Sequence, residues 1–275
     1  MVQILLNRSI IEFKGSGSLK FLQNQTTNNL VKYDYCYTYM LSNLGKYLFD
    51  FFCYKISDNH LIVDISSDQA QGLIQKLNFY NLRAGIEIRL SDKYIVTYSR
   101  QESYNQFNDK SIKCIRSYPD PRWKLLGFRS LISSKYAHNV SSSHHDVALE
   151  DKYEHAIPDG ADLIYDKSIP LEYGAEELNC IDFHKGCYIG QEVMSRTKYQ
   201  GVIRKKIFKM TSNDDLSCIS KGAAIKIEGD NIIGINCSSY KSKAIVLIRE
   251  EKYQNDLSGV TVDGIDVELE IPKWR

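Results

Sequence analysis

The sequence predicts an α+β fold that ends in a small β-barrel, and two features of its patterning indicate this. Short β-rich runs outnumber helical stretches over the first 200 residues, and after Gly201 only short strands separated by Gly, Asn and Asp remain. Closely spaced short strands are typical of a small barrel or sandwich. We therefore predict a first region of residues 1–200 and a barrel of residues 201–275, with the boundary near residues 199–202.

The first region is expected to alternate strands with short helices. Turn residues at 42–45 lie between two β-rich runs and predict a hairpin. An apolar stripe at helical spacing follows Asp68 and predicts a helix that ends near Asn81. Strands are expected at 2–6, 9–13, 35–41, 46–56, 61–65, 86–90, 94–99 and 125–129, and helical stretches at 19–30 (two short pieces), 69–81, 146–156 and 191–199. The barrel strands are expected at 202–210, 223–228, 231–236, 244–249, 260–262 and 266–271.

Composition and charge exclude several classes of protein. The formal net charge is +1, 43% of the 275 residues are hydrophobic and 25% are charged. Abundant apolar residues with low net charge exclude disorder as the main state. Proteins that bind duplex DNA or anionic membranes usually carry a basic excess, so we expect neither partner. No apolar run approaches the roughly 18–20 residues that a membrane span needs.

Cysteine usage indicates a reducing compartment. The seven cysteines are scattered, odd in number and never spaced as C-x-x-C, which argues against a disulfide framework and against a structural zinc site. The first eight residues become polar too soon for a secretory signal. We therefore expect a cytoplasmic protein without a bound metal.

The most informative segment lies around Cys187. Gly186 and Gly190 bracket this cysteine, so the backbone can turn tightly there. The helix expected after Gly190 carries Glu192 in its first turn and Arg196 in its last, an order that suits the helix dipole. A thiol near a helix N-terminus and near Lys185 is favoured as a thiolate, as a reactive cysteine requires. The alternative is a buried, inert thiol, which is common for free cysteine.

Residues 185–192, KGCYIGQE, resemble the signature K-G-C-[YF]-x-G-Q-E of the YgfZ-type folate-binding proteins. These are relatives of the glycine-cleavage T-protein, an aminomethyltransferase, and include mitochondrial iron–sulfur assembly factors. Further segments that resemble the family in order are FLQNQTTN at 21–28, LSNLGK at 41–46, DPR at 120–122, GFR at 127–129, IP at 157–158 and YQG at 199–201.

The resemblance implies a ring-like, three-part, T-protein-like fold, in which residues 1–200 form two intertwined α+β subdomains around a central cavity for tetrahydrofolate or another reduced folate. A pterin needs a carboxylate that pairs with its amino-pyrimidine edge, and Glu150 falls where the T-protein supplies that acid. Further folate-binding residues implied by the resemblance are Lys185, Gly186, Tyr188, Gly190, Gln191, Glu192 and Arg196.

The sequence departs from the T-protein at its catalytic acids. The T-protein follows a glycine turn with two aspartates, whereas this chain has Phe49 and Asp50, and a phenylalanine cannot accept a proton. We therefore expect a folate-binding factor that supports maturation of iron–sulfur enzymes, with Cys187 as the functional thiol. The alternative is a tetrahydrofolate-dependent aminomethyltransferase or another one-carbon transferase that uses Asp50.

Two further groups bear on partners. Six basic residues lie near the barrel junction and predict either an electropositive funnel for an anionic folate tail or a solvated surface. They are Arg196, Lys198, Arg204, Lys205, Lys206 and Lys209. Two residues are alternatives for a partner of Cys187. His184 could activate the thiol or form half of a metal or cluster site with it, and Cys180 could act as a resolving thiol. Expected partners are folate and iron–sulfur apoproteins or their assembly machinery, without direct nucleic-acid binding, and the chain is expected to be a monomer.

Overall fold

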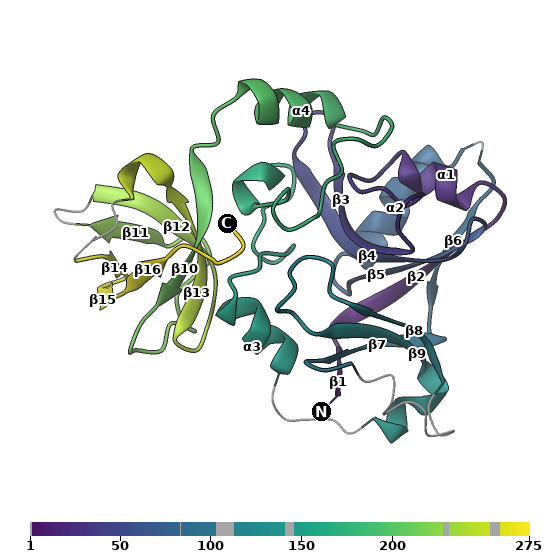
Figure 1. Cartoon of the computed structure of the whole chain (residues 1–275), viewed down its shortest axis with the longest axis horizontal. Helices are drawn as coiled ribbons and strands as arrows, with labels where there is room; N and C mark the ends of the chain where they lie inside the picture. The colour runs from purple at the N-terminus through teal and green to yellow at the C-terminus, as the bar shows by residue number, and fades with distance from the viewer. Residues whose placement is uncertain (1, 83, 103–112, 141–145, 228–230, 254–258) are drawn as a thin grey trace.

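The chain folds into three antiparallel sheets that surround a largely irregular central segment (Figure 1). A computed structural model describes residues 2–275 apart from 83, 103–112, 141–145, 228–230 and 254–258. The five-stranded sheet has the order β3 (Tyr35–Leu41), β4 (Tyr47–Ser57), β5 (His60–Ser66), β2 (Arg8–Lys14), β6 (Glu87–Ser91). The four-stranded sheet has the order β1 (Gln3–Ile4), β7 (Tyr94–Ser99), β9 (Phe128–Ser133), β8 (Cys114–Pro119).

The third sheet forms the predicted C-terminal barrel, which is nearly closed. Its seven strands have the order β15 (Ile265–Asp266), β14 (Thr261–Val262), β11 (Ala224–Ile227), β12 (Asn231–Tyr240), β13 (Lys243–Arg249), β10 (Lys205–Thr211), β16 (Glu268–Glu270). The described helices are α1 (Ser18–Gln23), α2 (Ala70–Tyr80), α3 (Val147–Glu154) and α4 (Gln191–Gln200), with 3-10 turns at Ser134–Asn139, Pro170–Tyr173 and Glu250–Lys252. The predicted α+β class is confirmed.

Strand alternation decides which side chains of the five-stranded sheet face the centre of the molecule. Successive side chains of a strand point to opposite faces. In β4, Phe51 and Cys53 belong to the core that the sheet shares with α1 and α2, whereas Phe52 and Tyr54 belong to the central core. Both faces of this strand are therefore buried, which explains its nearly continuous apolar sequence.

Several predicted elements were wrong in place or type. Residues 24–30 form turns and not a second helical piece, because the Thr26 hydroxyl and the Asn28 amide bond to the backbone, which competes with helix formation. Strand β8 was not predicted. It lies at the edge of its sheet and ends at Pro119, and none of its residues is buried, so it carries little of the apolar pattern that identifies a strand. Strand β9 begins at Phe128 and not at residue 125.

The C-terminus returns to the centre of the molecule (Figure 1). The Trp274 indole donates a hydrogen bond to the His155 carbonyl at 2.9 Å. Its ring lies against Gly174, where a Cβ atom would come within 2.3 Å of it. The chain after the barrel therefore packs on the first region, and the division at residues 200 and 201 stays a prediction.

No described helix is both long enough and apolar enough to cross a membrane.

The Glu12 carboxylate makes stability depend on pH. Its side chain is buried on β2 and contacts Lys14, Ser91 and Lys93. Burial acts to raise the pKa of Glu12, but the hydrogen bonds and charges of these neighbours lower it from 4.5 to about 2. A lowered pKa stabilises the fold above the unfolded-state value, and this stabilisation is lost as the pH falls from 4.5 to 2.

We predict that Glu12→Gln lowers the free energy of unfolding at neutral pH by on the order of 3 kcal/mol, because the shift of the pKa sets that scale. Urea unfolding of both chains between about pH 6 and pH 2.5 measures the difference, which should shrink below pH 4.5. Glu87→Gln, which changes an exposed glutamate on the neighbouring strand β6, is the control and should show no such trend. A Glu12→Gln difference that is independent of pH would contradict the prediction.

Candidate functional site

The octapeptide at 185–192 forms the turn that leads into α4 and presents its cysteine to solvent. Lys185 and Tyr188 are buried, whereas Gly186 and Cys187 between them are exposed. Gly190 has a positive φ of 84° and directly precedes the first residue of α4. The burial that the alternative assumed is therefore wrong for Cys187, and its reactivity stays a prediction.

The Lys185 ammonium is used inside the protein. Its Nζ atom donates hydrogen bonds to the carbonyl oxygens of Gln23, Thr26 and Asn28, at 2.7, 2.5 and 2.7 Å. Burial lowers the pKa of Lys185 to about 8. An ammonium has three donors, so none is left for a ligand. The three carbonyls belong to the segment 21–28 that also carries the family resemblance.

Gly190 lies against the hairpin turn at 42–45. A Cβ atom on Gly190 would lie 2.6 Å from the Ser42 carbonyl oxygen and 3.2 Å from Gly45 Cα. A Cβ atom on Gly45 would in turn lie 3.2 Å from Val193 in α4. Three segments that resemble the family, at 21–28, 41–46 and 185–192, therefore meet at the base of the Cys187 turn.

The polar residues at the start of α4 point to solvent or stay within the turn. The backbone N–H of Gln191 donates to the Tyr188 carbonyl at 3.2 Å. Glu192 and Arg196 are exposed, and within the described part of the chain no ion pair joins them. None of the predicted folate-binding residues of the octapeptide lines the polar cavity that the N-terminal segment, the four-stranded sheet and α3 form.

Asp50 faces the centre of the molecule and is buried. Its two carboxylate oxygens accept hydrogen bonds from the hydroxyls of Tyr37 and Tyr47, the second at 2.5 Å. A Cβ atom on Gly160 would lie 2.1 Å from the Asp50 carboxylate. Phe49, its neighbour in β4, points to the opposite face and contacts Tyr165 at 5.7 Å between ring centroids. Asp50 is thus a buried hydrogen-bond acceptor and not a solvated turn residue.

A polar cavity of about 320 Å³ lies where the N-terminal segment, the four-stranded sheet and α3 meet. Its wall includes residues 3–7 and apolar residues such as Leu126. The charged and aromatic residues that line it are Arg8, Tyr98, Arg122, Arg129, Asp146, Lys152 and Asp159. We call it the central cavity. Four cationic side chains converge on this space, which therefore suits a ligand with anionic or hydrogen-bond-accepting groups.

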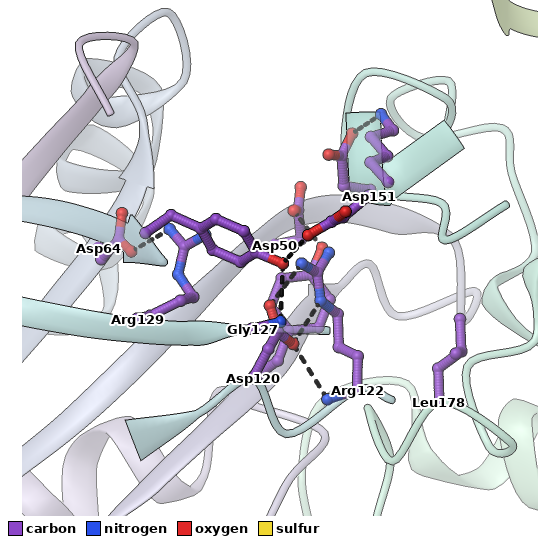
Figure 2. Close-up of polar contacts among 12 residues, drawn as sticks. Asp50, Asp64, Asp120, Arg122, Gly127, Arg129, Asp151 and Leu178 are labelled. Carbon is purple, nitrogen blue, oxygen red and sulfur yellow. Dashed lines mark hydrogen bonds and ion pairs between the residues drawn. The ribbon is translucent and has the colours of Figure 1, made fainter. Parts of the chain in front are cut away.

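Buried carboxylates hold the arginines of the central cavity in place (Figure 2). Asp64 accepts hydrogen bonds from Arg8 Nε and Arg129 Nη2, each at 2.6 Å, and Asp120 binds Arg122 in a bidentate way at 2.9 and 2.7 Å. Burial acts to raise the pKa of Asp64, but the two arginine charges lower it. One donor, the buried Nε of Arg129, has no hydrogen-bond partner among the described residues.

The Phe52 ring lies among the same three arginines. The guanidinium carbons of Arg129, Arg122 and Arg8 are 3.9, 5.0 and 5.8 Å from its centroid. Arginine stacks well on an aromatic face. The ring therefore fixes the planes of the guanidinium groups that border the cavity.

Lys152 and Asp159 also line the central cavity, and Asp162 lies behind them as a second acidic partner of Lys152. Lys152 Nζ lies 2.7 Å from Asp159 and 2.8 Å from Asp162. Burial acts to raise both carboxyl pKa values; the Lys152 charge lowers that of Asp159 to about 2, whereas that of Asp162 stays raised. The other cavity carboxylate, Asp146, caps α3 by accepting from the Leu149 N–H at 3.0 Å. Asp159 is therefore an ionised acid that the central cavity can offer to a ligand.

Glu150 does not line the central cavity. It lies in the first turn of α3 and pairs with Lys241 at 3.1 Å, with Arg100 at 3.6 Å. It borders a separate cavity of about 210 Å³ with Tyr153 and Tyr240. Its role as the pterin acid remains a prediction.

The basic group near the barrel is partly neutralised. Lys198 pairs with Glu176, Lys206 with Glu250 at 2.9 Å, and Lys209 with Glu154 at 3.1 Å. An open electropositive funnel is therefore weaker than the sequence predicts, since half of its six members have acidic partners. The other three, Arg196, Arg204 and Lys205, have no ion pair within the described ranges.

Of the two alternative partners of Cys187, the structure argues against Cys180. Cys180 is fully buried, which raises its thiol pKa, so it does not meet an exposed thiol as a resolving cysteine. His184 is exposed. The described residues hold no group of three or more His, Cys, Asp or Glu side chains that could bind a metal ion.

Sequence reasoning missed the lysine contacts and the arginine-lined cavity. Lys185 contacts residues that are 157–162 positions away in the chain, and no local pattern reports such a contact. The available signal was the DPR and GFR matches, whose arginines are Arg122 and Arg129 of the central cavity.

We predict that the two glycines of the octapeptide respond differently to alanine. Gly190→Ala should lower the free energy of unfolding by roughly 1–3 kcal/mol, because Gly190 has a positive φ and its Cβ would clash with Ser42. Gly186→Ala is the matched control and should stay within about 0.5 kcal/mol, because nothing lies within 4 Å of its Cβ position. Urea denaturation measures both. Equal effects of the two changes would be inconsistent with this geometry.

The sequence was compared with protein families and with curated proteins. No protein-family model matches the sequence. The mitochondrial iron–sulfur cluster assembly factor IBA57 homologue of Neurospora crassa is 28% identical over 257 residues, which cover 82% of this chain and 55% of that protein. The homologue of Dictyostelium discoideum is 30% identical, with 74% and 60% covered. Human IBA57 is 25% identical, with 97% and 83% covered.

The first relatives are longer than this chain, which spans between half and two thirds of their length. All of the relatives named above are mitochondrial proteins. This finding overturns the cytoplasmic location expected from the sequence. Reduced cysteines exclude an oxidising compartment, but they do not distinguish one reducing compartment from another.

A solved structure shows the fold. The glycine cleavage system aminomethyltransferase T of Bartonella henselae superposes with a TM-score of 0.77 at 12% identity, and the match covers 98% of this chain and 84% of that one. Both comparisons agree with the octapeptide: the chain is a homologue of the IBA57 iron–sulfur cluster assembly factors, built on the fold of the glycine cleavage T-protein.

Proposed function

We propose that this chain is a mitochondrial, folate-binding factor that supports maturation of iron–sulfur enzymes and acts through the Cys187 thiol. The observation that carries this proposal is the exposed Cys187 on a turn whose two ends are anchored in the protein. An exposed thiol is accessible to a protein partner, whereas the central cavity is suited to a small molecule. The IBA57 relatives are iron–sulfur cluster assembly factors, which supports iron–sulfur maturation as the process.

The central cavity fits a reduced folate in its donor set. Its volume of about 320 Å³ lies near the lower end of ligand pockets, so it would enclose the ring and leave the tail outside. The Asp159 carboxylate would accept from the amino-pyrimidine edge, and the guanidinium groups that border the cavity would donate to ring acceptors. When bound, the folate would supply a one-carbon carrier.

The alternative is an aminomethyltransferase or another one-carbon transferase that uses Asp50. The T-protein fold and the central orientation of Asp50 favour this reading. Both carboxylate oxygens of Asp50, however, already accept hydrogen bonds from tyrosine hydroxyls. A general base must reach the proton that it removes. We therefore assign Asp50 a structural role, in which it orients Tyr37 and Tyr47.

We predict that Cys187→Ser abolishes support of iron–sulfur enzymes in cells that lack the native gene. The free energy of unfolding should change by less than about 0.5 kcal/mol, because the side chain is exposed. Cys218→Ser changes the other exposed cysteine of the described chain and should leave that support intact. The activities of iron–sulfur enzymes in cell extracts measure the effect. Full activity with Cys187→Ser would overturn the proposed role of the thiol.

We predict that Asp159→Asn weakens binding of tetrahydrofolate about 10- to 100-fold, because a hydrogen bond to a charged group contributes about 1.5–3 kcal/mol. Calorimetric titration measures the affinity, and thermal melting checks that the variant is folded. Glu150→Gln tests the acid that the family resemblance implies. If Asp159 pairs with the pterin, Asp159→Asn should lose affinity for tetrahydrofolate and Glu150→Gln should not. Cys187→Ser should bind as the unmodified chain does, because the thiol lies outside the cavity wall. Absence of any binding heat in the unmodified chain would count against the folate proposal.

A further inference from the structure

We propose that Lys185 is the positioning residue for the Cys187 thiol. Its ammonium fixes the start of the K-G-C turn to the segment 23–28. The exposed residues Gly186 and Cys187 therefore follow directly after a residue whose position is fixed. This inference rests on the proposed role of the thiol. It gives Lys185 the role of positioning the thiol, in place of the folate-binding role that the resemblance implies.

The carbonyl oxygens that Lys185 binds come from one compact turn. The oxygens of Gln23, Thr26 and Asn28 all lie within 2.7 Å of its Nζ atom. Buried carbonyl groups require hydrogen-bond partners, and charged donors provide the strongest ones. Because residues 24–30 form turns and not a helix, these carbonyls have no helical N–H to accept from. The ammonium supplies the hydrogen-bond donors that the N–H groups of a helix would otherwise supply.

The chain that leads to Lys185 is joined to the same turn by further bonds. The Asp182 N–H donates to the Thr27 carbonyl at 3.0 Å, and the Thr27 hydroxyl donates to the Cys180 carbonyl at 2.7 Å. The Asn28 amide donates to the Asn179 carbonyl at 2.7 Å. Residues 179–185 are therefore held along their length, and Lys185 is the last held residue before the thiol.

The other end of the turn is held as well. Tyr188 is buried in the central core, and Gly190 lies against the hairpin turn at Ser42. The Lys185 ammonium lies 5.2 Å from the centroid of the Tyr188 ring, so the two anchors contact each other beneath the exposed pair. A thiol on so short a link between two fixed points has little freedom, and this order reduces the entropy that docking of a partner must overcome.

The chemistry requires lysine at this position. A compact ammonium can direct three donors at three carbonyls around it, whereas the guanidinium of arginine presents its donors in a plane. Methionine keeps the apolar stem and removes all donors. Lys185→Arg and Lys185→Met therefore separate the geometry of the donors from the packing of the stem.

The contacts of Lys185 also give a pH readout. The groups that face it are the Cys36 thiol of β3, the Asp182 carboxylate and the Tyr188 ring. Burial keeps the pKa of the Cys36 thiol high, at about 12, and lowers that of Lys185 to about 8. Above pH 8 the neutral amine has two donors for three carbonyls, so the turn at Cys187 should loosen.

The experiment places a nitroxide label on Cys187 in a chain whose other accessible cysteines, Cys114 and Cys218, are serines. Electron paramagnetic resonance spectra are recorded between about pH 6.5 and pH 9.5 for this chain, Lys185→Met and Lys185→Arg. Lys198→Met is the matched control, because it removes a nearby positive charge that does not contact segment 23–28. A second control carries the label on Cys218, with Cys187 and Cys114 as serines, and reports on the barrel.

The expected result is a severalfold larger mobile component at Cys187 in Lys185→Met at neutral pH, with unchanged spectra in Lys198→Met and at Cys218. Lys185→Arg should be mobile at all pH values, and the unmodified lysine should become mobile with a midpoint near pH 8. Unchanged mobility in Lys185→Met, equal loosening at both labels, or a pH response that persists in Lys185→Met would each overturn the proposal. Complementation by Cys187→Ser tests the function of the thiol separately. A failure of the proposed thiol function is therefore distinguishable from a failure of the positioning role of Lys185.

Discussion

The structure depends on one requirement: irregular backbone in the centre of the molecule must find hydrogen-bond partners. Residues 155–190 run between the three sheets with only a single 3-10 turn, and residues 24–30 meet them without helix or strand (Figure 1). Side chains of Thr27, Asn28 and Lys185 provide many of the missing partners. Such residues therefore matter for the fold as much as the apolar core does.

The central cavity shows the same principle for charge. Isolated buried cations would be costly, so each arginine of the cavity has a buried aspartate or the Phe52 ring beside it. Pairing restricts the arginines and compensates part of their positive charge. What the wall offers a ligand is directional: guanidinium donors and the ionised Asp159 carboxylate. A ligand with both donors and acceptors matches such a wall better than a simple anion does.

The thiol and the cavity are two separate sites on one scaffold. Cys187 lies within the turn that precedes α4, and the cavity lies between α3 and the four-stranded sheet. No residue of the octapeptide lines the cavity. This separation is consistent with a factor that binds a small molecule and presents a thiol to a protein.

Local pattern determined the helices α2, α3 and α4, the β3–β4 hairpin and the barrel strands, because apolar periodicity, turn residues and caps act over a few residues. The sequence also singled out Cys187 and its flanking glycines. Tertiary structure alone decided that Asp50 is enclosed by Tyr37 and Tyr47, that Glu150 lies outside the central cavity, and that Lys185 binds carbonyls. Each of these outcomes depends on which distant segments meet, and a side chain's chemistry follows from the neighbours that the fold gives it.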